Sequence, residues 1–151
     1  MNVHVRLMTE DDIGDVVEIS SLSFPHSWSR SSYQQELQNS LAKYFVAEIN
    51  NKVVGFIGTW LIVDESHITN VAVHPDFRKS GIASKLIESM ISYCKEHGCI
   101  AYTLEVRAGN TPARSLYEKH GFKQDGIRKG YYQDNNEDAI FHFIERNRVE
   151  I

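Results

Sequence analysis

The sequence has few cysteines and no long apolar run, and each scarcity excludes a class of protein. Cys94 and Cys99 are the only cysteines among 151 residues. Their spacing is not that of a zinc site, a disulfide between them depends on geometry that sequence does not specify, and we expect reduced packing residues. No apolar run approaches the ~20 residues that cross a bilayer, and acidic residues from Glu10 to Asp12 stand where a signal peptide would be apolar. A cytoplasmic protein with no membrane partner is therefore expected.

Basic residues are also scarce relative to acidic ones. There are 16 Lys and Arg against 20 Asp and Glu, which gives a net charge of −4. Proteins that wrap nucleic acid show the opposite excess, so no direct nucleic-acid partner is expected. The chain is 42% hydrophobic and 24% charged, with three scattered prolines, no repeat and no linker-like stretch. Residues 1–151 are therefore predicted to form a single globular domain.

Apolar periodicity predicts strands and helices that alternate through the middle of the chain. Strands are expected at 2–7, 44–49, 53–63, 67–73 and 100–107, helices at about 9–17, 29–39, 81–98 and 111–121, and two closing strands in the remainder through Tyr131, Tyr132 and 139–143. The segments 44–49 and 53–63 are predicted to pair as a hairpin. This pattern favours a mixed α/β or α+β fold in which helices cover a twisted sheet.

The passage from Val71 to Ile87, VAVHPDFRKSGIASKLI, places a basic glycine-containing loop between a strand and a helix. Backbone N–H groups in the first turn of a helix lack partners and lie at the positive end of its dipole, so they can bind a pyrophosphate. Gly81 would let the ligand approach, and Arg78 and Lys79 add positive charge. The alternative is an ordinary turn with solvated basic side chains. The passage matches neither GxxxxGK[ST] nor GxGxxG, which argues against a nucleotide triphosphatase or a dinucleotide oxidoreductase.

Two residues are candidates for acid and base chemistry. The alternation of 100–107 places Glu105 and Arg107 on the face opposite Leu104 and Val106. A carboxylate inside a β-rich run has either a partner or a task, and Arg107 could be that partner. Tyr117, at helical spacing in 111–121, could equally be a core residue.

The seven histidines do not indicate a metal site. His67, His97, His120 and His142 lack the close paired spacing of metal ligands, and HExxH is absent. His74 follows the strand 67–73 and is expected to be a strand-end residue. No metal is expected.

Two motifs resemble one family. Arg78, Gly81 and Ala83 match the R/QxxGxG/A loop of the GNAT superfamily, the Gcn5-related N-acetyltransferases. The segment 104–122, LEVRAGNTPARSLYEKHGF, closely resembles the LEVRxxNxxAxxLYxxxGF signature of its RimI-type branch, the ribosomal-protein N-terminal alanine acetyltransferases. The resemblance covers essentially the full length. It implies the GNAT fold, a mixed central twisted sheet of about six to seven strands flanked by about four helices.

The resemblance implies acetyl-CoA as co-substrate. Residues 71–73 would pair through their backbone with the pantetheine arm, as an added strand would, residues 79–84 would cradle the pyrophosphate, and the Val73 N–H would face the oxyanion. The implied cofactor residues are Val71, Ala72, Val73, Arg78, Lys79, Ser80, Gly81, Ile82, Ala83, Ser84, Asn110 and Tyr117.

In that branch the matching glutamate is the general base and the matching tyrosine the general acid, which implies these roles for Glu105 and Tyr117. A base is needed because an α-amino group, with a pKa near ~8, is mostly protonated at neutral pH. The implied acceptor groove is formed by Phe24, Trp28, Asn70, Tyr131 and Tyr132. His26 and Ser27 separate Pro25 from Trp28 where relatives often run more directly from Pro to Trp, which leaves the peptide preference open.

The leading hypothesis is acetyl transfer to a protein N-terminus, with the N-terminal alanine of a small-subunit ribosomal protein as the implied substrate. One alternative keeps the chemistry but changes the acceptor to a lysine side chain, a polyamine or another small amine. A second alternative is a non-catalytic module that binds acetyl-CoA as a sensor. The protein is expected to be a monomer or a weak dimer.

Overall fold

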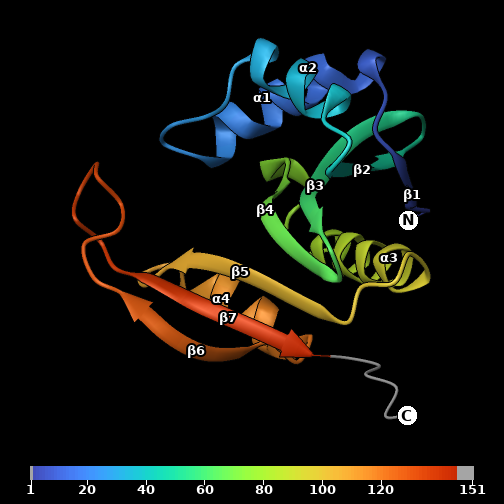
Figure 1. Ribbon diagram of the computed structural model, residues 1–151. Helices are drawn as coiled ribbons and strands as arrows, with labels where there is room; N and C mark the ends of the chain where they lie inside the picture. The colour runs from blue at the N-terminus through green and yellow to red at the C-terminus, as the bar shows by residue number, and fades with distance from the viewer. Residues whose placement is uncertain (1, 146–151) are drawn as a thin grey trace.

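A computed structural model describes residues 2–145 and shows one mixed sheet with helices on both faces (Figure 1). Its strands are β1 (His4–Leu7), β2 (Ala42–Ile49), β3 (Lys52–Ile62), β4 (Glu65–Val73), β5 (Ala101–Arg107), β6 (Lys123–Arg128) and β7 (Ala139–Glu145). Its helices are α1 (Ile13–Ser23), α2 (Arg30–Gln38), α3 (Ile82–Glu96) and α4 (Thr111–Lys119), with single 3-10 turns at Glu10–Asp12 and Pro75–Phe77. The predicted mixed sheet of six to seven strands with four helices is confirmed.

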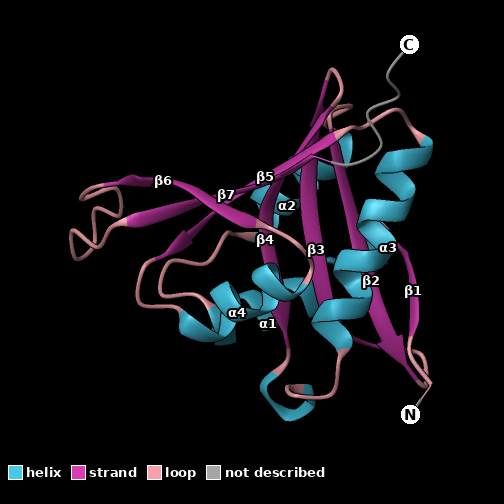
Figure 2. Ribbon diagram, turned by 90° about the horizontal axis from the view of Figure 1, so that it is seen from below, coloured by secondary structure: helices cyan, strands magenta, loops and turns pink. Residues whose placement is uncertain are grey.

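In the described part of the chain the sheet has seven strands, in the order β1-β2-β3-β4-β5-β7-β6. All neighbouring pairs are antiparallel except β4 and β5. These two parallel strands pair only over residues 65–67 and 101–103. Beyond that point they separate, and β5, β7 and β6 turn away from β1 to β4 (Figures 1 and 2). Within residues 2–145, the second half of β4 therefore has one edge that is not paired with another strand.

Two apolar layers hold the helices on the sheet. One cluster packs α1 and α2 against one face of β2, β3 and β4, with Ile13, Val16 and Tyr33 fully buried. The other cluster packs α3 and α4 against the opposite face. The predicted stripe of α3, from Ile82 through Leu86 to Cys94, is buried there because residues four apart share one side of a helix.

Local sequence explains the main turns. Asn50 and Asn51 both have positive φ, at 50° and 65°, as a type I′ hairpin turn requires, and they join β2 to β3 as predicted. Gly58 lies at a register shift between β3 and β4. A Cβ atom at Gly58 would come within 2.5 Å of the Tyr44 ring and 2.7 Å of Asn70 Oδ1, so only glycine fits beneath these side chains.

The end of the chain differs from the expectation in one respect. Two closing strands form, but Tyr131 and Tyr132 lie in the loop that joins β6 to β7 (residues 129–138). The aromatic pair has high strand propensity, but Gly130 has a positive φ of 61° and its N–H donates to Asp138 Oδ1 at 2.9 Å, which turns the chain out of the sheet.

Cys94 and Cys99 are free and buried, as expected. Within residues 2–145, no helix combines the length and the apolar character that crossing a membrane would take.

Candidate active site

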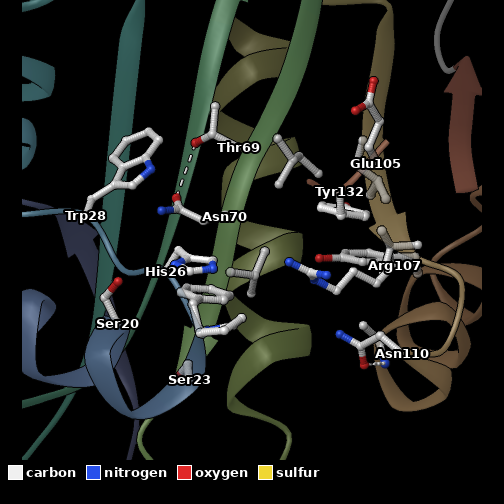
Figure 3. Close-up of a pocket in the computed structure, with 18 of the residues that line it drawn as sticks. Ser20, Ser23, His26, Trp28, Thr69, Asn70, Glu105, Arg107, Asn110 and Tyr132 are labelled. Carbon is white, nitrogen blue, oxygen red and sulfur yellow. Dashed lines mark hydrogen bonds between the residues drawn. The ribbon is translucent and has the colours of Figure 1, made fainter. Parts of the chain in front are cut away.

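A cavity of about 380 Å³ lies where β4 and β5 separate. Its walls come from α1, the α1–α2 loop, α2, β4, β5, α4 and the β6–β7 loop. The residues that line it are Ser20, Ser23, Phe24, Pro25, His26, Trp28, Tyr33, Ile68, Thr69, Asn70, Val71, Leu104, Glu105, Val106, Arg107, Asn110, Ala113, Tyr117 and Tyr132. Figure 3 shows His26, Trp28 and Asn70 on one side and Glu105 and Arg107 on the other.

The cavity therefore collects most of the predicted catalytic and acceptor residues. Both predicted catalytic residues line it, as do Phe24, Trp28, Asn70 and Tyr132 of the predicted acceptor groove. Tyr131 is not among its lining residues. It is exposed in the β6–β7 loop, with its ring 5.1 Å from that of Tyr132.

Glu105 projects from β5, and its side chain is 14% exposed. Arg128 Nε of β6 lies 3.3 Å from its Oε1. The carboxylate also lies against the Tyr131 hydroxyl, and hydrogen bonding to it raises the pKa of Tyr131. The suggested pairing with Arg107 was wrong, because Arg107 bonds Asp134 and Glu137 instead. Sequence reasoning missed Arg128, since no local pattern ties β6 to β5.

Tyr117 is both a core residue and a cavity residue. Its side chain is 9% exposed and packs edge-on against Phe122 at 5.9 Å between ring centroids, with His142 at 6.4 Å. Burial raises the pKa of the Tyr117 phenol well above its ordinary value. The phenol therefore keeps its proton at neutral pH, which is the protonation state that a general acid needs.

The cavity wall opposite Glu105 is a hydrogen-bonded network of polar side chains. Of these, the sequence predicted only Asn70 as a site residue. The Tyr33 hydroxyl donates to Ser20 Oγ at 3.0 Å, and Asn70 Nδ2 lies 3.4 Å from the same hydroxyl. Asn70 Oδ1 accepts from Thr69 Oγ1 at 3.2 Å (Figure 3). Ser20 and Tyr33 are fully buried. Their partners lie on different elements, so helical spacing alone could not have indicated the network.

The basic loop lies at the carboxyl end of β4, before α3. Lys79 and Gly81 both have positive φ, at 61° and 83°, and among the described residues no side chain caps the start of α3 at Gly81. A Cβ atom at Gly81 would meet nothing within 4 Å. Exposed N–H groups at the positive end of a helix, beside a lysine, fit a pyrophosphate. The Ile82 side chain is buried, so only its backbone could contribute.

Arg78 differs from its neighbours in this loop. Its Nε donates to the Val73 carbonyl at 3.0 Å, and its Nη2 lies 3.3 Å from Ser23 Oγ. The guanidinium therefore faces the end of β4 and the end of α1. Ser84, in the first turn of α3, has its Oγ 3.0 Å from Nε2 of His120, which ends α4.

The three residues predicted to pair with pantetheine, 71–73, do not all point their backbone N–H groups to the same edge of β4. The N–H of His74 donates to the Val54 carbonyl at 2.8 Å, toward β3. Backbone N–H groups alternate sides along a strand. The N–H of Ala72 therefore also points toward β3, whereas the N–H groups of Val71 and Val73 point to the unpaired edge of β4. Only Val71 and Val73 thus present backbone groups toward the cavity side. His74 caps the turn 75–77 through Nδ1, which fits a strand-end residue.

Comparison with known proteins agrees with this architecture. Residues 13–122 match the acetyltransferase (GNAT) family. The chain belongs to the GNAT family. A Bacillus subtilis protein provisionally named ribosomal protein bS18-alanine N-acetyltransferase is 40% identical over 144 residues, 95% of each chain. An N-alpha-acetyltransferase of Saccharolobus solfataricus is 34% identical over 142 residues, 85% of this chain and 84% of that one.

The fold of this GNAT protein matches a solved structure along its whole length. The crystal structure of the ribosomal-protein-S18-alanine N-acetyltransferase from Escherichia coli superposes with a TM-score of 0.87 and 28% identity, covering 99% of this chain and 100% of that one. The predicted fold and the predicted N-acetyltransferase class are confirmed.

Proposed function

We propose that this protein transfers the acetyl group of acetyl-CoA to the α-amino group of a protein N-terminus, with the N-terminal alanine of a small-subunit ribosomal protein as acceptor. The observation that carries the proposal is the placement of a carboxylate, Glu105, and a protonated phenol, Tyr117, around one cavity between the separated strands. The printed names of the Bacillus and Escherichia relatives support the acceptor.

Each residue has one task in the proposed reaction. Glu105 takes a proton from the acceptor's ammonium group, directly or through a water, so that the amine becomes a nucleophile. The neutral amine then attacks the thioester carbon, so that a carbon–nitrogen bond forms as the carbon–sulfur bond breaks. Tyr117 gives its proton to the leaving sulfur, and the second proton that the nitrogen loses restores the phenol through water. The N–H of Val73, on the unpaired edge of β4, is the proposed donor to the carbonyl oxygen, where negative charge develops.

Acetyl-CoA supplies an activated acyl group as a thioester when it is bound. Backbone groups of Val71 would hold its extended arm, and the uncapped first turn of α3 with Lys79 and Gly81 would hold its pyrophosphate. Asn110 caps α4, its Oδ1 accepting from the Ala113 N–H at 3.3 Å, and it lines the cavity.

The test is release of free thiol from acetyl-CoA with two matched peptides. One begins with a free alanine, and the other is the same peptide with a blocked N-terminus and an internal lysine. We expect turnover on the first only. Turnover on the lysine peptide alone would favour the side-chain alternative, and no turnover on either peptide, despite acetyl-CoA binding in calorimetry, would favour a small amine or a sensor.

A further inference from the structure

The side chain of Arg107 lines the cavity but bonds outward, to the β6–β7 loop (residues 129–138). Its Nη1 and Nη2 donate to the two carboxylate oxygens of Asp134, each at 3.0 Å. Nη1 also lies 3.4 Å from Glu137 Oε1. Two carboxylates therefore neutralise one guanidinium, and a paired two-pronged contact of this kind fixes geometry as well as charge. Arg107 is thus not a free cation for an anionic ligand.

The same guanidinium supports a wall of the cavity. Its central carbon lies 4.0 Å from the centroid of the Tyr132 ring, and Tyr132 is half-buried and lines the cavity. Arg107 lies 26% exposed, so this stacking contact is partly withdrawn from water. The Tyr132 ring therefore packs on Arg107, the β5 residue two positions after Glu105.

Glu137 ties the far end of the loop to the end of β5. Its Oε2 accepts from the N–H of Gly109 at 2.8 Å. A Cβ atom at Gly109 would lie 2.7 Å from that oxygen, so a larger residue there would require the Glu137 carboxylate to shift. The loop is also bonded internally, with the N–H of Asn136 donating to the Tyr132 carbonyl at 2.8 Å. The loop and β5 thus form one bonded unit around Arg107.

The unit reaches the opposite wall of the cavity. His26 Nε2, in the α1–α2 loop, lies 3.9 Å from Asp134 Oδ2. The two loops that flank the cavity approach each other at the carboxylate that Arg107 holds. By contrast, the basic loop before α3 provides none of the residues that line the cavity.

We infer that Arg107 is a positioning residue for the acceptor: by holding Asp134, Glu137 and the Tyr132 ring, it fixes the β6–β7 loop as one wall of the acceptor pocket. The inference rests on the proposed function for the identity of the acceptor. It assigns Arg107 no contact with acetyl-CoA or with the reacting atoms. Loss of Arg107 should therefore weaken acceptor binding and leave acetyl-CoA binding unchanged.

The test compares Arg107→Gln with a matched control, Arg6→Gln. Arg6 is 32% exposed and also bonds two carboxylates, Asp12 at 2.8 Å and Glu48 at 3.2 Å, but it lies on β1. We expect Arg107→Gln to raise KM for the acceptor about tenfold, about 1.4 kcal/mol, with the acetyl-CoA dissociation constant from calorimetry unchanged. Arg6→Gln should change neither quantity.

Two further measurements separate positioning from general loosening. Backbone hydrogen exchange in residues 129–138, measured without acceptor, should quicken in Arg107→Gln and not in Arg6→Gln. In Arg107→Gln the carboxylates of Asp134 and Glu137 lose the cation that they share. Adding Asp134→Asn removes one of these two negative charges, and should therefore recover part of the lost affinity for the acceptor. Asp134→Asn alone keeps the inference testable if Arg107→Gln does not fold, since it should also quicken exchange in the loop.

Several results would overturn the inference. These are unchanged exchange in the loop, a quickened loop with an unchanged acceptor KM, or equal losses of acceptor and acetyl-CoA affinity. A wild-type protein inactive on free N-termini would refute the proposed function instead. If the protein instead turns over another amine, KM is measured with that amine. If it turns over none, hydrogen exchange in residues 129–138 alone decides whether Arg107 holds the loop.

Discussion

Replacing Glu105 by Gln tests the proposed base with little change of shape. The substitution removes the carboxylate and its contact with Arg128 at 3.3 Å. Because Arg128 is 58% exposed, water can solvate it, and the lost ion pair should cost less than about 1 kcal/mol of folding stability. The variant should therefore fold, and any loss of rate reports on catalysis.

The size of the expected effect follows from the titration of the acceptor. General bases contribute about 100- to 10,000-fold, so at pH 7 the rate of Glu105→Gln should fall by at least about 100-fold. An α-amine with a pKa near ~8 is about one-tenth neutral at pH 7 and about nine-tenths neutral at pH 9. The neutral fraction rises as the pH rises. The ratio of wild-type to variant rate should therefore shrink about tenfold between pH 7 and pH 9.

The assay is thiol release from acetyl-CoA at both pH values, with saturating co-substrate and the alanine peptide. Glu48→Gln is the matched control, because Glu48 is 17% exposed and lies 3.2 Å from Arg6, on β2 and away from the cavity. An unchanged rate in Glu105→Gln at pH 7 would remove Glu105 from the mechanism. A constant ratio between pH 7 and pH 9 would refute its role as the base.

Three further outcomes are expected. Tyr117→Phe should lower kcat about 100-fold without changing the acetyl-CoA dissociation constant, and unaltered turnover in a rapid-mixing assay would end its role as acid. Gly58→Ala should destabilise the fold by about 1–3 kcal/mol in urea unfolding, because the new methyl group would collide with Asn70. Hydrogen bonds from Arg6 lower the pKa of Asp12 below its ordinary value, so the contribution of Asp12 to stability is present above about pH 4 and is lost as the pH falls through the folded-state pKa. Asp12→Asn should therefore lower the urea midpoint at pH 7 and make the midpoint depend less on pH in acid. An equally steep fall of the midpoint with acid in the variant and the wild type would contradict this.

The sequence by itself determined the features that depend on neighbours along the chain. The buried stripe of α3 and the face of β5 that carries Glu105 follow from periods of 3.6 and 2, which the backbone imposes on every helix and strand. The turn before α3 follows likewise from Gly81, whose left-handed conformation costs glycine little. The motifs around Gly81 and Glu105 were sufficient to predict the GNAT fold.

Only the tertiary structure decided which side chains meet across strands that are distant in sequence. Arg128 lies beside Glu105 because β7 pairs with both β5 and β6, which places β6 two strands from β5. Arg107 bonds the β6–β7 loop rather than its neighbour on the strand. Strand propensity predicts a strand through Tyr131 and Tyr132, but the turn at Gly130 places both in the β6–β7 loop. The separation of β4 from β5, which opens the cavity, likewise depends on how two halves of the sheet pack against their own helices. Such contacts depend on the summed packing of the whole chain, which local periodicity does not encode.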